Sequence, residues 1–174
     1  MSRENFYSLR RINNEIKKYW LIDEDYIDPL VEFNNRIRHI GIIDDVIYFM
    51  LIKNRNNIIN KLDDGNIVIA FEMRKSNYPF GPPKKTLING RNYFNYLKPS
   101  GPNYKILETF IGKTCLCCST LMCKSNWGPQ KQLKDILQEI IENFNLKQRI
   151  VEYIHAKKIK DKYLIDDIPI FDYI

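Results

Sequence analysis

The chain has 174 residues and a formal net charge of +6, and its composition is 44% hydrophobic and 28% charged. This length supports one good hydrophobic core and argues against a second full domain, and the composition indicates a globular chain. No apolar run approaches the roughly 20 residues of a membrane helix, and the N-terminus lacks a signal peptide's apolar core. We therefore expect a cytoplasmic or nuclear protein with reduced thiols and no membrane partner. Nucleic acid is a disfavoured partner because the basic residues are spread along the sequence.

The first predicted element is an amphipathic helix. Leu9, Ile12 and Ile16 recur at helical spacing, whereas Arg10 and Arg11 fall on the opposite face. The apolar stripe predicts a helix that docks on the core. The basic face has two interpretations, a solvated surface or a surface for a protein partner.

A run of strands follows without intervening helices. Stretches rich in β-branched and aromatic residues cover 36–43, 46–53 and 67–73, with turns at Asp44-Asp45 and at Asp64-Gly65, and a short strand is predicted at 84–88. Consecutive strands of this kind predict a four-stranded antiparallel meander. Residues 89–111 read as a long, mostly polar connection, which in a compact domain is usually functional or disordered.

The clearest helix of the sequence begins after Trp127-Gly128-Pro129. Its apolar residues keep one face through three turns, and we expect them to bury against the sheet. A shorter, separate helix is predicted at about 146–158. The residues that form the apolar face are Leu133, Ile136, Leu137, Ile140, Ile141 and Phe144.

The cysteines are concentrated in one stretch, between Gly112 and Pro129. They allow three interpretations: a nucleophile, a group of metal ligands, or an ordinary buried strand. Structural zinc normally uses two well-separated pairs of ligands, which this spacing does not provide, and the two histidines are distant in sequence. We therefore expect no metal and no cofactor. The residues concerned are Cys115, Cys117, Cys118 and Cys123, with His39 and His155 as the histidines.

The order of these elements resembles that of ubiquitin-conjugating enzymes, over roughly residues 8–144. The most specific matches are the Tyr-Pro-Phe-Gly-Pro-Pro-Lys run at 78–84, Gly-Lys-Thr-Cys-Leu at 112–116, and Trp-Gly-Pro at 127–129. The resemblance implies a single α+β domain over 1–174, with a four-stranded antiparallel meander packed by helices. It also implies a long insertion at about 89–111 and a shortened C-terminal helical part.

By this resemblance, one cysteine carries ubiquitin or a ubiquitin-like modifier as a thioester, received from an activating enzyme and passed to a lysine or a ligase. Cys115 fits as the nucleophile because Gly112 lies three positions before it and Leu116 follows it. Cys118 is the alternative, since the residues after it and its spacing to Trp127 also fit. Cys117 and Cys123 are then expected to serve packing.

Other residues of the resemblance are less well matched. Gly101-Pro102-Asn103 stands where the family has His-Pro-Asn, so Asn103 is either the oxyanion-stabilising amide or an ordinary turn asparagine. This departure keeps a second interpretation open, a non-catalytic binding or scaffold protein with the same fold.

The resemblance also implies partner surfaces. Phe80, Trp127 and Pro129 would contact a ligase, and we expect Phe80 and Pro129 to lie close together on adjoining exposed loops. Arg10 and Arg11, on the basic face of the first helix, would meet the activating enzyme.

Overall fold

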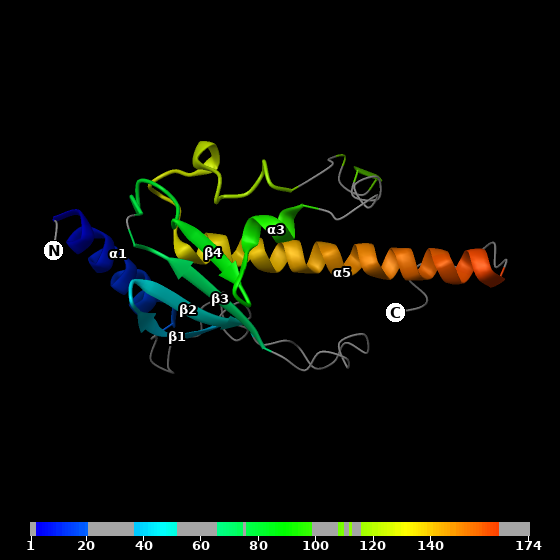
Figure 1. Cartoon of the computed structure of the whole chain (residues 1–174), viewed down its shortest axis with the longest axis horizontal. Helices are drawn as coiled ribbons and strands as arrows, with labels where there is room; N and C mark the ends of the chain where they lie inside the picture. Colours follow the sequence, from blue (N-terminus) through cyan, green and yellow to red (C-terminus); the bar gives the residue numbers. More distant parts are fainter. Residues whose placement is uncertain are drawn as a thin grey trace.

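The computed structural model describes residues 3–20, 37–51, 66–74, 76–98, 108–109, 112 and 116–163. The described part is an α+β arrangement of one antiparallel sheet with helices. Figure 1 shows α5 running behind the sheet and α1 beside it at the left. In chain order the elements are α1 (Arg3–Trp20), β1 (Ile37–Ile43), β2 (Val46–Leu51), β3 (Ile67–Glu72), β4 (Lys85–Ile88), β5 (Arg91–Asn92), α3 (Tyr93–Leu97), the 3-10 turn η3 (Lys124–Asn126) and α5 (Leu133–Tyr163).

The sheet is a meander in which each strand pairs with the next, in the order β1-β2-β3-β4-β5. The expected antiparallel order is therefore confirmed for the first four strands. Asp44 and Asp45 close the first hairpin with φ values of 49° and 63°, the left-handed geometry that matches the twist of a two-residue hairpin turn. The expectation of four strands is wrong, because Asn89 and Gly90 turn the chain back so that Asn92 pairs with Leu87. The fifth strand was not predicted because two residues are too few to show a strand pattern in the sequence.

The start of the predicted polar connection is also structured. The last residue of β5, Asn92, caps α3, because its side chain accepts a hydrogen bond of 3.0 Å from the backbone NH of Phe94. One turn of helix then buries Tyr93 and Leu97 in the core. The interpretation of 89–111 as a polar connection is thus wrong for residues 91–97.

The core lies between the sheet and the two long helices. The predicted apolar face of α5 is buried as expected, and four of its residues are 0% exposed. They belong to the same cluster as Ile12 and Ile16 of α1 and the inward-facing side chains of the strands. The four are Leu133, Ile136, Leu137 and Ile140.

The helix α5 is one continuous element of 31 residues, so the predicted break before a separate helix at 146–158 is wrong. Two side-chain pairs at i,i+4 spacing support it on either side of the expected break: Gln138 donates to Glu142 at 2.8 Å, and Gln148 to Glu152 at 2.9 Å. At 1.5 Å per residue the helix is about 46 Å long, and it extends well beyond the sheet (Figure 1). None of the helices in the described ranges is long and apolar enough to cross a bilayer.

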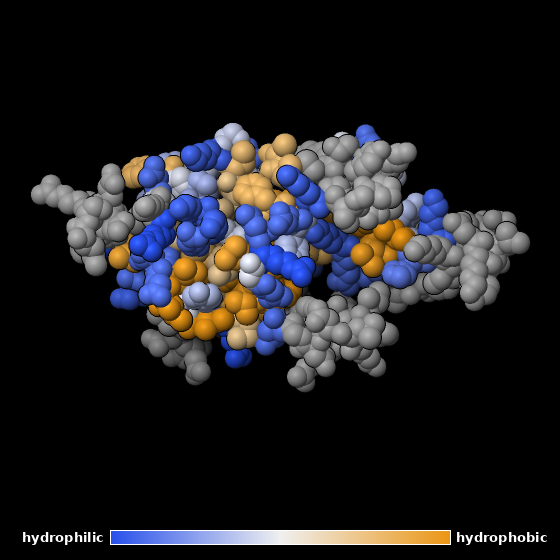
Figure 2. Space-filling view, in the orientation of Figure 1, coloured by the Kyte–Doolittle hydropathy of each residue, from blue (hydrophilic) through white to orange (hydrophobic). Residues whose placement is uncertain are grey.

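The face of the sheet opposite α5 carries exposed apolar side chains. Figure 2 shows this hydrophobic surface over β1–β3, toward the lower left of the view. Ile40 is the extra residue of a β-bulge between His39 and Gly41, and it is exposed together with Ile43 and Val68. Exposed apolar residues of this kind are common on protein surfaces.

Candidate functional site

The second half of the cysteine-rich stretch, Leu116–Cys123, forms a series of tight turns that we call the cysteine turn. The backbone NH of Ser119 donates to the Leu116 carbonyl, and that of Cys123 donates to the Thr120 carbonyl, both at 3.1 Å. The interpretation of this stretch as an ordinary buried strand is therefore wrong for these residues. The turn is joined to α3 because the backbone NH of Leu116 donates to the Leu97 carbonyl at 3.0 Å.

A carboxylate on α5, Glu139, anchors the cysteine turn through hydrogen bonds. Its Oε1 accepts from the Thr120 hydroxyl at 2.5 Å and from the Tyr93 hydroxyl at 2.9 Å, and its Oε2 accepts from the backbone NH of Leu121 at 2.6 Å. Hydrogen bonds to an ionised acceptor are stronger than neutral ones. Burial, with the nearby Glu139 charge, raises the pKa of Tyr93, so this phenol stays a hydrogen-bond donor. The turn is therefore fixed to both α5 and α3.

A side-chain amide, that of Asn126, also holds the backbone of the cysteine turn. Nδ2 of Asn126 donates to the carbonyls of Cys118 and Thr120, at 2.8 Å and 3.0 Å. Met122 is buried, and its sulfur accepts from the Thr86 hydroxyl of β4 at 3.1 Å. Since both amide hydrogens of Asn126 are directed at the backbone of the turn, we assign this residue a positioning role.

The three described cysteines differ in their surroundings, and all carry reduced thiols. Cys118 is exposed, whereas Cys117 is half-buried and packs against the core as expected, with the two sulfurs 4.0 Å apart. The Cys123 sulfur lies 3.1 Å from the Ser125 hydroxyl, and this hydrogen bond lowers the pKa of the Cys123 thiol. The turn thus presents an exposed thiol at Cys118 and a partly exposed, more acidic one at Cys123.

Two of the predicted catalytic residues, Cys115 and Asn103, lie outside the described residues, so their placement stays a prediction. Gly112 is described and exposed, with a φ of 65° that glycine adopts readily. Within the described ranges, no group of three histidine, cysteine or carboxylate side chains could hold a metal ion.

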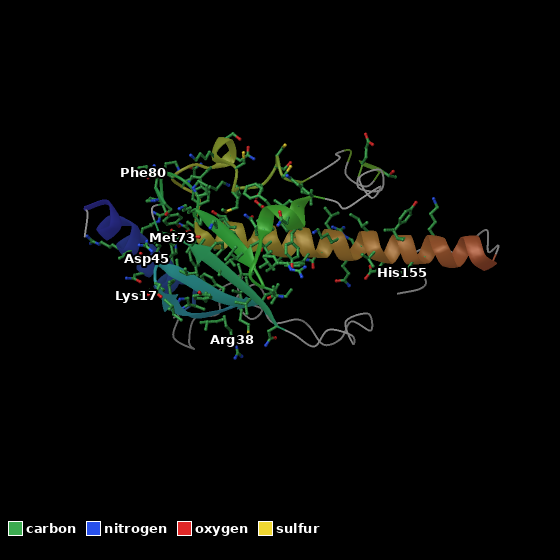
Figure 3. All side chains as sticks on the ribbon, in the orientation of Figure 1. Lys17, Arg38, Asp45, Met73, Phe80 and His155 are labelled. Atoms are coloured by element: carbon green, nitrogen blue, oxygen red, sulfur yellow. The ribbon has the colours of Figure 1, made fainter. Side chains whose placement is uncertain are left out.

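The Tyr-Pro-Phe turn and the Trp-Gly-Pro turn are in contact. The indole NH of Trp127 donates to the Pro79 carbonyl at 2.8 Å, and the rings of Tyr78 and Trp127 lie 5.8 Å apart. Phe80 is 79% exposed and projects at the upper left of Figure 3, and Pro129 is exposed as well. The two loops therefore adjoin, with Phe80 and Pro129 outside and Trp127 partly packed on the core.

A second carboxylate, Glu15 of α1, lies beneath the Tyr-Pro-Phe turn and is only 3% exposed. It accepts from the Tyr78 hydroxyl at 2.5 Å, from Nε of Arg11 at 2.6 Å, and from the backbone NH of Leu133 at 3.0 Å. The hydrogen bond to Glu15 raises the pKa of Arg11, and burial, with the Glu15 charge, raises that of Tyr78. Arg11 is thus used within the fold, which leaves Arg10 as the exposed member of the predicted basic pair.

The sequence patterns did not identify Glu15, Asn126 or Glu139. Each falls among other polar residues, and only the folded chain brings its partners together. The one local signal is the position of Glu15 and Glu139 beside buried residues of their helices, Ile16 and Ile140. No protein-family model, curated protein or solved structure matches the chain.

Proposed function

We propose that this chain transfers ubiquitin or a ubiquitin-like modifier through a cysteine thioester formed in the segment 115–118, on a fold of the ubiquitin-conjugating type. The observation that carries the proposal is the anchoring of the cysteine turn. Its backbone is fixed by Glu139 and Asn126 while Cys118 remains exposed. A reactive thiol needs access to solvent together with a defined position, and this turn supports both requirements.

The chemistry follows from the thiol. A thiolate attacks the thioester carbonyl carbon of the modifier held by an activating enzyme, a new C–S bond forms, and the enzyme's thiolate leaves. A lysine amine then attacks the new thioester, a C–N bond forms, the C–S bond breaks, and the amine loses a proton. Each attack creates an oxyanion, and one side-chain amide donor near it typically contributes ~10²–10³ in rate. Asn103 is our candidate for that donor.

We assign the nucleophile to Cys115, with Cys118 as the alternative. Cys115 has the glycine and leucine neighbours described above, and it directly precedes the residue that joins the turn to α3. Cys118 is exposed in the structure, which keeps it as the alternative.

The partner surfaces in this proposal follow from exposure. Phe80 and Pro129 stand on two adjoining loops tied by the Trp127–Pro79 hydrogen bond, and they would contact a ligase. Arg10 and the exposed lysines of α1, Lys17 and Lys18, would face the activating enzyme.

The second candidate is a non-catalytic binding protein with the same partners. It is favoured by the 79% exposure of Phe80 on one loop and the exposure of Pro129 on the adjoining loop, since a fixed apolar loop pair needs no chemistry to bind. The histidine of the family's His-Pro-Asn motif also has no counterpart next to Asn103. The two histidines of the chain are elsewhere, His155 far along α5 (Figure 3) and His39 on β1. For this candidate Phe80→Ala removes binding, whereas loss of every cysteine leaves binding unchanged.

The test is incubation with ubiquitin, an activating enzyme and ATP, read on gels with and without reductant. The proposal predicts a band shifted by one ubiquitin that reductant removes. Cys115→Ser should replace it by a reduction-resistant ester or by nothing, whereas the matched control Cys117→Ser should leave it unchanged. Loss of the band in Cys118→Ser alone moves the nucleophile to Cys118. No charging of the wild type by activating enzymes for ubiquitin and its relatives supports the binding protein instead.

A further inference from the structure

A small hollow lies between α3 and α5, next to the cysteine turn. Its volume is about 10 Å³, room for about one water molecule, which is too small for a cofactor. Its lining is mostly aromatic and aliphatic, with one amine. The residues that line it are Ile88, Tyr93, Tyr96, Leu97, Ile140, Asn143, Phe144 and Lys147.

Lys147 is half-buried and is the one lysine that lines this hollow. Its Nζ lies 4.9 Å from the centroid of the Tyr96 ring, and that ring packs edge-on against Phe144 at 6.0 Å. The lining contains no carboxylate. Burial lowers the pKa of Lys147, because the apolar lining of the hollow disfavours the charged ammonium. A larger share of this amine is therefore neutral and nucleophilic at neutral pH than for an exposed lysine.

The hollow and the cysteine turn share two anchoring residues. Leu97 lines the hollow, and its carbonyl accepts from the backbone NH of Leu116, the residue after Cys115. Tyr93 also lines the hollow, and its hydroxyl binds the same Glu139 carboxylate as Thr120 of the turn. The hollow that holds the amine and the cysteine turn are therefore attached to the same two helices, α3 and α5.

We propose that Lys147 is a modification site of this chain, an amine that accepts acyl groups from thioesters, including the modifier carried on the chain's own cysteine. The step is aminolysis: the neutral Nζ attacks the thioester carbonyl carbon, a C–N bond forms, the C–S bond breaks, and the thiolate takes up the proton that nitrogen releases. Transfer from the chain's own cysteine rests on the proposed function above. The reactivity of Lys147 toward other thioesters does not depend on it.

The first experiment uses a small thioester and needs no activating enzyme. The folded wild type is incubated with S-acetyl-N-acetylcysteamine at neutral pH, and acetylation of each lysine is followed by peptide mass spectrometry. Lys157, exposed on the same helix, is the matched control. We expect Lys147 to be acetylated several-fold faster than Lys157, and this preference to disappear in urea. Equal or slower acetylation of Lys147 in the folded protein overturns the inference.

The second experiment uses the ubiquitin charging reaction and looks for a band that survives reductant. We expect that band to map to Lys147, and to be lost in Lys147→Arg but kept in Lys157→Arg, since a guanidinium retains the charge without accepting an acyl group. The reducible band should be unchanged in both variants. A resistant band that persists in Lys147→Arg, or its absence from a charged wild type, contradicts the inference but leaves the proposed function intact. Without charging the proposed function fails, and the small-thioester result alone decides the inference.

Discussion

The molecule contains two clusters built in the same way around a carboxylate on a helix. Glu15 of α1 and Glu139 of α5 each accept two side-chain hydrogen bonds, including one from a tyrosine hydroxyl, and one from a backbone NH. The Glu15 cluster joins α1, the Tyr-Pro-Phe turn and the first residue of α5. The Glu139 cluster joins α5, α3 and the cysteine turn.

The two clusters differ in burial and in charge compensation. Glu15 is buried and is paired with Arg11, whereas Glu139 is half-buried and receives only neutral donors among the described residues. Glu15 connects elements that build the core, so its replacement should lower the stability of the whole fold. Glu139 holds a surface turn, so its replacement should mainly change the accessibility of the thiols. The following predictions test this division from the largest expected effect to the smallest.

Replacement of Glu15 should have the largest effect on stability. Glu15→Ala leaves the Leu133 NH and the Tyr78 hydroxyl without their acceptor in a buried site. Each buried donor left unsatisfied in this way lowers the free energy of unfolding by about 1–3 kcal/mol. Urea unfolding followed by circular dichroism measures it. Arg10→Ala, an exposed neighbour on the same helix, is the control and should change stability by less than about 0.5 kcal/mol. If the two variants are equally stable, Glu15 does not organise the fold.

Replacement of Glu139 should act locally. Glu139→Ala removes three hydrogen bonds to a half-buried charge, and we expect the free energy of unfolding to fall by about 1.5–3 kcal/mol. The larger change should be in the cysteine turn, where Cys117 becomes accessible and is alkylated by iodoacetamide several-fold faster. Glu142→Ala, one turn along and exposed, is the matched control. Unchanged alkylation of Cys117 in Glu139→Ala would show that the turn does not depend on this carboxylate.

Asn126→Ala should have a smaller effect of the same kind. It removes two amide hydrogen bonds to carbonyls of the turn, and the free energy of unfolding should fall by about 1 kcal/mol. Amide hydrogen exchange should rise in the cysteine turn and stay unchanged around Glu15. Exchange that rises equally at both clusters would mean that they are not independent.

A buried polar group without a partner gives the contrasting case. Nε2 of His39 is buried with no hydrogen-bond partner in the described part of the chain, and the ring packs against Phe49 at 5.4 Å. Burial lowers the pKa of His39 below its unfolded value of about 6.5.

The unfolded chain therefore takes up this proton first as the pH falls. The contribution of His39 to stability is complete above about pH 6.5 and is lost progressively below it, toward the lowered pKa of the folded state. His39→Leu should lose less stability than the wild type between pH 7.5 and 5.5, as measured by urea unfolding. Equal pH dependence of the two proteins would contradict this assignment.

The fold was largely predictable because its signals are periodic. Runs of β-branched and aromatic residues at 46–53 and 67–73 predicted the antiparallel sheet, and helical spacing from Leu133 to Ile140 predicted the buried face of α5. The short elements β5, with two residues, and α3, with five, do not repeat a pattern and gave no such signal. The expected break before a separate helix at about 146–158 was wrong, because α5 continues through Asn143 and Asn145 although asparagine is a weak helix former.

The site was less predictable for a physical reason. Glu139 and its partner Tyr93 are 46 positions apart, and Glu15 and Leu133 are 118 apart, so no local pattern connects them. The motifs located the thiol segment and the two adjoining loops, since these depend on cysteine, proline and tryptophan at fixed positions. The carboxylates that hold those loops needed the folded chain.

The most direct test of thioester transfer is charging of a protein that keeps a single thiol. A variant with Cys117, Cys118 and Cys123 changed to serine retains only Cys115, and a matched variant retains only Cys118; circular dichroism confirms that both are folded. With ubiquitin, an activating enzyme and ATP, intact mass spectrometry should show one ubiquitin on the Cys115 variant, removed by reductant, and none on the Cys118 variant. If neither folded variant is charged under conditions that charge a known conjugating enzyme, the chain does not transfer ubiquitin through these thiols.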